Sequence, residues 1–134
     1  MSAILSHITL GVSDIPRATT FYDAVLGELG IARGKSGDGF AGWGSPHESG
    51  FFITRPLNGQ AASVGNGVSV SFLAPTRDAV DRFHAKAMAL GATDEGKPGI
   101  RPHYHANYYA AYLRDPDGNK IAAVCHDAVT THGR

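Results

Sequence analysis

Large apolar residues alternate with small or polar ones near the start of the chain, along residues 7–12, HITLGV. This period of two predicts a β-strand with one covered face. We expect Ile8, Leu10 and Val12 to face a core. The side chain of His7 then points to the opposite face of the strand.

The pattern next changes to that of an amphipathic helix. Asp14 can cap this helix, and Pro16 suits its first turn because a proline there loses no helical hydrogen bond. Gly27 or Gly30 is expected to end it. The apolar stripe, at helical spacing, consists of Ala18, Phe21, Tyr22, Val25 and Leu26.

The second half of the chain repeats these patterns. Residues 68–72, VSVSF, alternate in the same phase as residues 7–12. Ser69 stands where His7 stands in the first half, and Thr76 takes the helix-capping place. The second helical stripe consists of Ala79, Val80, Phe83, Ala87 and Leu90, followed by Gly91.

Three short extended segments follow each predicted helix. They are residues 31–33, 40–43 and 50–54 in the first half, and residues 93–96, 108–114 and 120–125 in the second. Each half, 1–62 and 63–134, therefore reads βαβββ. A duplicated unit of this kind cannot bury its strand face alone, so the copies should pack together. We predict a single α+β domain, residues 1–134, in which two βαβββ modules form a cupped mixed sheet with the helices on its outer face.

Composition narrows the choice of partners. Twelve basic residues balance twelve acidic ones, without a basic cluster, in a chain of 134 residues. We therefore expect no nucleic-acid or membrane surface, and a small molecule as the ligand. Cys125 is the only cysteine, which excludes an internal disulfide. With neither a leader segment nor a long apolar run to be read, we expect a cytoplasmic protein.

Two stretches, HITLGVSDIPRATTFYDAVLGELG and AAYLRDPDGNKI, together with the duplicated βαβββ pattern, resemble the vicinal oxygen chelate superfamily. It includes glyoxalase I, extradiol dioxygenases, methylmalonyl-CoA epimerase, the fosfomycin-resistance transferases and the bleomycin-resistance binding proteins. The resemblance covers essentially the whole chain. It implies a homodimer, because in these families strands from two modules, often on different chains, complete the cup. Uncovered inner faces would leave a large apolar patch.

The resemblance also implies a divalent metal site, which this sequence does not retain. Metal-dependent members hold the ion with a His on the first strand, an acidic or similar residue on the fourth, a His or similar residue on the fifth and a Glu on the eighth. His7 matches the first position, but Phe52, Ser69 and Ala122 stand at the others. A lone imidazole cannot hold an ion in competition with water. We therefore expect no metal and no other cofactor at the family site.

The segment 101–109, RPHYHANYY, concentrates side chains that can bind a ligand. One interpretation is a surface loop with packed tyrosine rings and solvated imidazoles. The other is a lid over the cup, in which His103 or His105 touches a bound molecule with Tyr108 nearby. The connection can take that position in the resembling family. His126, at the cup end of the last predicted strand, is a further candidate.

Histidine spacing leaves a relocated metal site open as an alternative. His103 and His105 point the same way in extended chain, and with His7 and His126 they would supply four imidazoles to a divalent metal. The sequence alone does not show that these four side chains converge.

The remaining candidates have structural interpretations as well. Trp43 is expected to pack in the core, with an aromatic wall for a flat ligand as the alternative. Cys125 has the helix-facing phase and should be a packed thiol. His84 and His47 are expected to be solvated, and His132 belongs to a frayed tail.

Two functions from different classes follow from these residues. A metal-independent binding protein, similar to the bleomycin-resistance members, would hold a small, partly aromatic molecule in the cup. Its contacts would come from His7, Trp43, Phe52, Ser69, His103, His105, Tyr108, Ala122 and His126. An enzyme of the glyoxalase or dioxygenase type would need the relocated metal, or acid–base chemistry by His7, His103 or His105. The missing carboxylates favour the binding protein.

Overall fold

The structure, a computed structural model, describes residues 4–45 and 50–128. The first half contains β1 (His7–Gly11), α1 (Ile15–Gly27), β2 (Arg33–Gly37), β3 (Phe40–Trp43) and β4 (Gly50–Thr54). The second half contains β5 (Val70–Leu73), α2 (Arg77–Ala89), β6 (Thr93–Ile100), β7 (Tyr109–Arg114) and β8 (Lys120–Cys125). Each half therefore has the βαβββ order that the hydrophobic pattern predicts.

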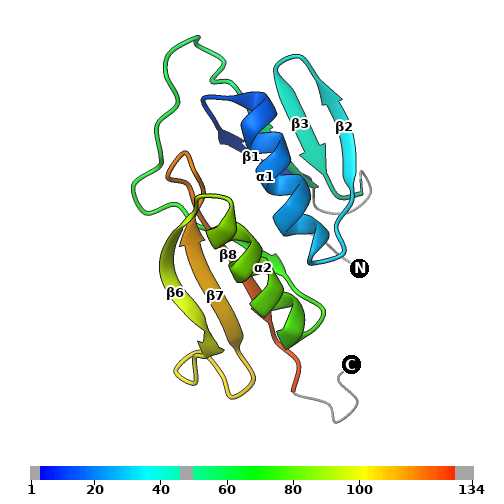
Figure 1. Ribbon diagram of the computed structural model, residues 1–134, viewed down its shortest axis with the longest axis vertical. Coiled ribbons are helices and arrows are strands. Elements are labelled where there is room, and N and C mark those ends of the chain that lie inside the picture. Colours follow the sequence, from blue (N-terminus) through cyan, green and yellow to red (C-terminus); the bar gives the residue numbers. More distant parts are fainter. Residues whose placement is uncertain (1–3, 46–49, 129–134) are drawn as a thin grey trace.

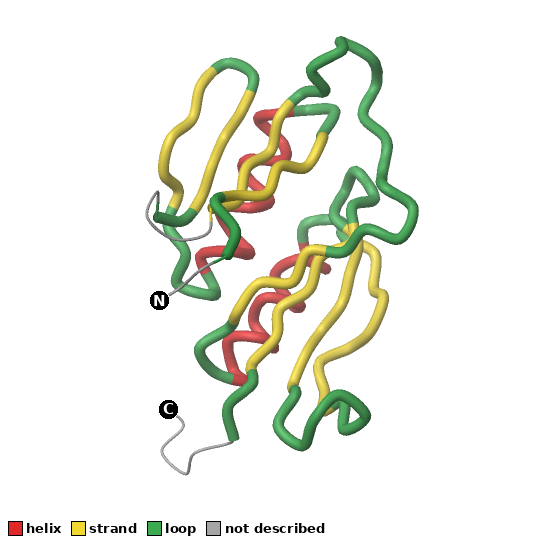
Figure 2. The backbone as a smooth tube through the Cα atoms, turned by 180° about the vertical axis from the view of Figure 1, so that it is seen from behind, coloured by secondary structure: helices red, strands yellow, loops and turns green. Residues whose placement is uncertain are grey.

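The strands form two mixed four-stranded sheets, ordered β1-β4-β3-β2 and β5-β8-β7-β6. In each sheet the first pair is parallel and the other two pairs are antiparallel. Both helices lie on one side of the sheets, in front of them in Figure 1 and behind them in Figure 2. We call the opposite side of each sheet its open face. The predicted α+β fold of two modules is confirmed.

Both helices begin where capping chemistry predicts. Asp14 Oδ1 accepts a hydrogen bond of 3.0 Å from the N–H of Arg17, and Thr76 Oγ1 accepts one of 3.0 Å from the N–H of Ala79. After α2 the chain turns at Gly91, whose φ of 96° suits a glycine. Within the residues that the structure describes, no helix is long and apolar enough to cross a membrane.

The helix-facing side chains of the strands build the core. On β8 the alternate residues Ile121, Ala123 and Cys125 are buried in one cluster with the helices, so Cys125 is the packed thiol that strand phase predicts. In the first module the ring of Tyr22 packs against that of Trp43, with centroids 5.7 Å apart. Helix α1 also packs against α2, which brings the two modules together.

Strands β1 and β7 each differ by one residue from the prediction, and three other strands differ by more. Strand β2 comprises Arg33–Gly37 rather than residues 31–33, and all of its side chains are exposed, so no apolar alternation marks it. Strand β5 begins at Val70, which leaves Ser69 just outside it. Strand β6 continues to Ile100, beyond the predicted residues 93–96, where its pairing with β7 is irregular and no regular apolar alternation marks it.

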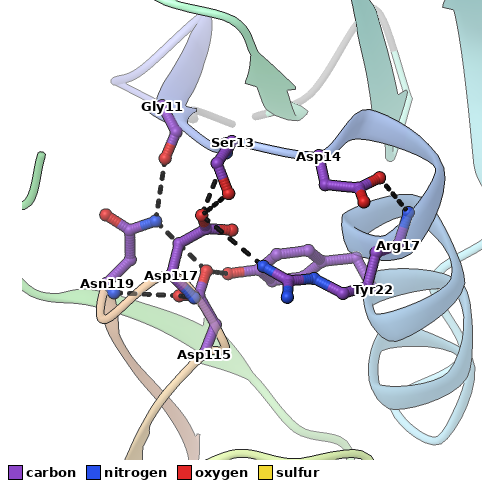
Figure 3. A network of polar contacts seen from close by, with 8 residues as sticks. All are labelled: Gly11, Ser13, Asp14, Arg17, Tyr22, Asp115, Asp117 and Asn119. Atoms are coloured by element: carbon purple, nitrogen blue, oxygen red, sulfur yellow. Dashed lines mark hydrogen bonds and ion pairs between the residues drawn. The ribbon is translucent and has the colours of Figure 1, made fainter. Parts of the chain in front are cut away.

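A network of hydrogen bonds joins the modules at the turn DPDGN between β7 and β8 (Figure 3). Tyr22, on α1, donates a hydrogen bond of 2.6 Å to Asp115 Oδ2, and both residues are buried. The side-chain amide of Asn119 donates one of 3.0 Å to the carbonyl of Gly11, at the end of β1. The second module is thus fixed to both α1 and β1 of the first.

Asp117 extends the same network on the more exposed side. Its Oδ1 accepts hydrogen bonds from the N–H and the hydroxyl of Ser13, at 2.9 and 2.7 Å, and lies 3.8 Å from the guanidinium of Arg17. Gly118 has a φ of 94°, which the tight turn requires. The turn motif that carries much of the family resemblance therefore has a structural role, independent of any metal.

Candidate functional site

The open face of the first sheet carries two phenylalanine rings. Phe52, on β4, is paired with Gly42 of β3, and a Cβ atom at Gly42 would overlap the Phe52 ring. The glycine therefore lets the ring lie close against the backbone. Phe40 lies beside it, with ring centroids 6.4 Å apart. Together the two rings, tilted by 41° to each other, form an apolar surface.

His7 stands next to this surface. Its ring meets that of Phe52 edge to face, with centroids 5.5 Å apart, and its Nδ1 is 2.9 Å from Ser6 Oγ. The side chain is exposed. His7 and Phe52 thus share the face that strand phase predicts, but only His7 offers a ligand atom for a metal.

Ala122 lies on the open face of the second sheet, but it is covered. It is paired with Tyr112 of β7 and Ser71 of β5, while its chain neighbours Ile121 and Ala123 belong to the core on the helix side. None of its surface is exposed. The phase predicted for Ala122 is therefore correct, but its methyl group is covered by neighbouring side chains and is not presented to a ligand.

Ser69 is not the residue beside Ala122. It precedes β5 and is exposed, and the strand residue opposite Ala122 is Ser71. The alignment of Ser69 with His7 by sequence phase therefore does not place its hydroxyl within the paired part of the sheet.

An aromatic cluster occupies the end of the second open face, and we call it the rim cluster: Tyr104, His105, Tyr108 and His126. The rings of His105 and His126 are stacked, with centroids 5.2 Å apart, and His105 Nε2 lies 2.9 Å from His126 Nδ1. Tyr108 contacts both imidazoles, at 5.6 and 5.4 Å, and Tyr104 lies 4.7 Å from Tyr108. The structure thus brings His105, Tyr108 and His126 together.

Hydrogen bonds assign the tautomers of the histidine pair. The N–H of Asn107 donates to His105 Nδ1 at 3.1 Å, so this nitrogen carries no proton. His105 Nε2 then carries the hydrogen and donates it to His126 Nδ1. Nε2 of His126 holds the remaining ring proton, and the ring is exposed. The pair therefore presents one imidazole N–H outward.

The imidazoles proposed for a relocated metal site do not all converge. His7 belongs to the first sheet, and His103 packs on Tyr104 at 4.3 Å, outside the histidine pair. Within residues 4–45 and 50–128, no three His, Cys, Asp or Glu side chains are arranged to hold an ion. Two adjacent imidazoles are fewer than the three protein ligands of an open zinc site. Neither the family positions nor the relocated set in this chain fits a metal ion.

Tyr112 is a site residue that the sequence reasoning missed. Its hydroxyl lies 2.9 Å from that of Tyr108, which links it to the rim cluster. Burial, followed by the hydrogen bond with Tyr108, raises the pKa of Tyr112 well above its usual value. The sequence does contain a signal for Tyr112. Tyr108, Ala110 and Tyr112 alternate along the chain, and Tyr112 pairs with Ala122 of β8, so the three residues share the open face.

Trp43 does not lie on the open face. It is 2% exposed, packs in the helix-side core and donates from Nε1 to Asp23 Oδ1 at 2.9 Å. The predicted aromatic wall in the cup is therefore wrong, and the core interpretation is correct. Trp43 does border a cleft of about 650 Å³ between the modules, whose other large apolar side chains include Ile31, Phe51 and Phe72.

His84 is a buried residue rather than a solvated one. It is 8% exposed, and its Nε2 lies 2.8 Å from Asp94 Oδ1. The expectation of a solvated side chain is wrong because β6 brings Asp94 against the helix. The hydrogen bond with His84 is the main cause that lowers the pKa of Asp94. His47 and His132 lie outside the described residues.

Comparisons with known proteins agree with this geometry. Residues 4–123 match the family model of the Glyoxalase/Bleomycin resistance protein/Dioxygenase superfamily. The chain is similar to the crystal structure of a glyoxalase/bleomycin resistance protein from Albidiferax ferrireducens T118, with 43% identity and a TM-score of 0.85 over 93% of this chain and 100% of that one. No curated protein matches the sequence.

More distant structures share the fold. A glyoxalase/bleomycin resistance protein/dioxygenase family enzyme from Burkholderia phytofirmans PsJN is 23% identical, with a TM-score of 0.70 over 93% of this chain and 100% of that one. Lactoylglutathione lyase from Agrobacterium tumefaciens is 21% identical, with a TM-score of 0.62 over 93% and 94%. Because the family model spans most of the chain and the Albidiferax protein is 43% identical over nearly all of it, this chain belongs to the glyoxalase/bleomycin resistance protein/dioxygenase superfamily.

Proposed function

We propose that the protein binds a small, partly aromatic molecule on the open face of its sheets without a metal ion. The rim cluster is the observation that carries this proposal. Tyr104, His105, Tyr108 and His126 present aromatic rings at the end of the second sheet, and Tyr104 is 61% exposed. Exposed aromatic rings held by hydrogen bonds are suited to stack on a flat ligand.

The residues at the positions of the family's metal ligands favour binding of an organic molecule over metal chemistry. His7 is accompanied by the ring of Phe52, which has no ligand atom, and Ala122 is buried beside Tyr112. A ligand on this face would therefore meet rings and hydroxyl groups.

The proposal includes a homodimer in the cytoplasm. Strands β1 and β5 each end the order of their sheet, and Leu73 on β5 is 72% exposed. Unpaired edges and exposed apolar side chains are suited to cover by a second copy, which would also complete the cup. Light scattering at micromolar concentration is the test, and a monomer would contradict it. Cys125, as an unpaired thiol, is consistent with a reducing compartment.

Titration with 2-naphthamide, an uncharged aromatic probe, tests the binding site. Chemical-shift changes in amide NMR spectra should concentrate at His105, Tyr108 and His126. Tyr104→Ala should weaken the affinity about three- to tenfold, which corresponds to about 0.5–1.5 kcal/mol for one aromatic contact. Ile31→Ala, in the cleft between the modules, is the matched control and should leave the affinity unchanged. Shift changes confined to the cleft would refute the proposal.

Metal analysis of protein purified without an affinity tag is an independent test. We expect no stoichiometric zinc, nickel, manganese or iron. One equivalent of metal that is lost on His7→Ala would mean that the family site is functional after all.

An enzyme using acid–base chemistry is a second candidate, and the histidine pair is the observation that favours it. His126 presents a ring N–H outward and is backed by His105, whose orientation the N–H of Asn107 fixes. Such a pair is placed to pass a proton to or from a bound substrate. Turnover of an α-oxoaldehyde or hemithioacetal that is abolished by His126→Gln would favour this candidate over simple binding.

A further inference from the structure

Arg101 carries a fixed positive charge on the open face of the second sheet. Its guanidinium lies over the ring of Tyr112, 5.5 Å from the centroid. Nη1 donates to the carbonyl of Gly99 at 2.8 Å, and Nη2 donates to that of Lys97 at 2.9 Å. A guanidinium has five N–H groups, so three remain for another acceptor. The two carbonyls hold the group in place without neutralising its charge.

Lys120 places a second cation on the same ring. Its Nζ lies 5.6 Å from the centroid of Tyr112. Among the described residues, neither Arg101 nor Lys120 forms an ion pair with a carboxylate. Arg114, which is on β7 as Tyr112 is, differs because Glu95 lies 3.2 Å from its Nε. Two cations on one aromatic ring, without an acid to pair them, form a positive site.

A hydroxyl hydrogen is available at the same place. The hydroxyl groups of Tyr108 and Tyr112 lie 2.9 Å apart, so one donates to the other and the second hydrogen is left for a further acceptor. A tyrosine hydroxyl is protonated at neutral pH, so both hydrogens of the pair are present. The Arg101 guanidinium and this hydroxyl pair are held by hydrogen bonds before a ligand arrives, which lowers the entropic cost of binding.

We propose that Arg101, Lys120 and Tyr112 form an oxyanion-binding site, and that the ligand of this protein is a small aromatic acid. This inference rests on the proposed function and specifies its ligand. Tyr108 belongs to the rim cluster and its hydroxyl meets that of Tyr112, which links the cluster to the ring that both cations contact. The planar guanidinium suits a planar carboxylate, which can accept two parallel hydrogen bonds from it.

The test compares 2-naphthoate with 2-naphthamide, which share a ring system and differ in charge. Calorimetry should show that the wild-type protein binds naphthoate at least tenfold more tightly than naphthamide. Arg101→Gln should remove this preference and leave the naphthamide affinity within about twofold. Lys97→Gln removes a cation of β6 that is 80% exposed and pairs with Asp94, so it is the matched control and should keep the preference.

Lys120→Gln provides a second variant that leaves the carbonyl contacts of Arg101 intact. It should reduce the preference for naphthoate about threefold or more, and added salt should reduce it further. Equal binding of the two probes by the wild-type protein would overturn the anion site while leaving the proposed function in place. Binding of naphthoate that Arg101→Gln and Lys120→Gln do not change would also overturn it. Failure of both probes to bind would refute the proposed function itself.

Discussion

The buried hydrogen bond between Tyr22 and Asp115 should contribute measurably to the stability of the whole domain. It joins α1 of the first module to the turn of the second at 2.6 Å, and the residues are 1% and 3% exposed. Tyr22→Phe removes the hydroxyl but keeps the ring, which also packs on Trp43 and Phe51. The substitution therefore isolates one polar contact between the modules.

The expected loss of stability is that of one hydrogen bond, because Asp115 keeps its other hydrogen-bond partners. Its carboxylate still accepts hydrogen bonds from the N–H groups of Asp117 and Asn119 and from the side-chain amide of Asn119. A hydrogen bond to a charged group contributes about 1.5–3 kcal/mol. We expect Tyr22→Phe to lower the free energy of unfolding by about 2 kcal/mol at pH 7.

The same contact predicts a change at alkaline pH. Burial, followed by the charge of Asp115, raises the pKa of Tyr22 well above its usual value of about 10. A group whose pKa is raised by folding stabilises the protein below its unfolded pKa, and that contribution is lost as the pH rises. The stability of the wild-type protein should therefore fall above about pH 10, by up to roughly 1.4 kcal/mol per pH unit for this one group. Tyr22→Phe should fall less steeply.

Urea denaturation, followed by far-UV circular dichroism and by Trp43 fluorescence, measures both effects. Tyr109→Phe is the control, because Tyr109 also donates a hydrogen bond of 2.6 Å, to Asp81, but at the surface. Burial is the main cause that raises the pKa of Tyr109, to about 12. Tyr109→Phe should lower stability at pH 7 by less than about 1 kcal/mol. A Tyr22→Phe variant that is as stable as the wild-type protein and has an unchanged alkaline slope would refute this role of the hydrogen bond.

Three further substitutions test other parts of the structure. Gly42→Ala should cost about 1–2 kcal/mol of unfolding free energy, because its Cβ displaces the Phe52 ring, and a double-mutant cycle with Phe52→Ala should recover most of that loss. Ala122→Glu should lower stability by about 3 kcal/mol, since a carboxylate enters a fully buried position; a thermal midpoint equal to that of the wild-type protein would exclude this burial. The hydrogen bond with His84 is the main cause that lowers the pKa of Asp94, so the wild-type protein should lose stability as the pH falls below about 4. In thermal denaturation from about pH 2.5 to 5, the stability of Asp94→Asn should fall less steeply with decreasing pH.

The fold was predictable where apolar alternation is regular. Strands β3, β4 and β8 have the predicted bounds, and both helices begin after the predicted capping residues. Strand β2 was misplaced because RGKSG has no apolar face, so only pairing with β3 reveals it. The start of β5 was expected at Val68 because Val68 continues the alternating pattern. In the structure Val68 is 51% exposed and lies outside the strand.

The candidate site was less predictable, because it depends on contacts between distant segments. The contact between His105 and His126 requires the loop before β7 to meet the end of β8. The spacing of residues along the sequence does not predict such a contact. Strand phase placed Ala122 on the correct face, but phase does not show that the position is covered. The charge of Arg101 is visible in the sequence, whereas only the structure shows that no carboxylate among the described residues forms an ion pair with it.

The DPDGN turn affects how tightly the two modules would associate if they were separate chains. Among the described residues, no backbone hydrogen bond crosses from one module to the other. The connection from Thr54 to Val70 is a long loop that runs along one edge of the molecule (Figure 1). Association therefore depends on side-chain contacts: the packing of α1 on α2 with the ion pair of Arg82 to Glu28, the ring contact of Phe51 with Phe72, and the network centred on Asp115. A chain divided within that loop would become a fragment-complementation pair, whose affinity reports directly on this network.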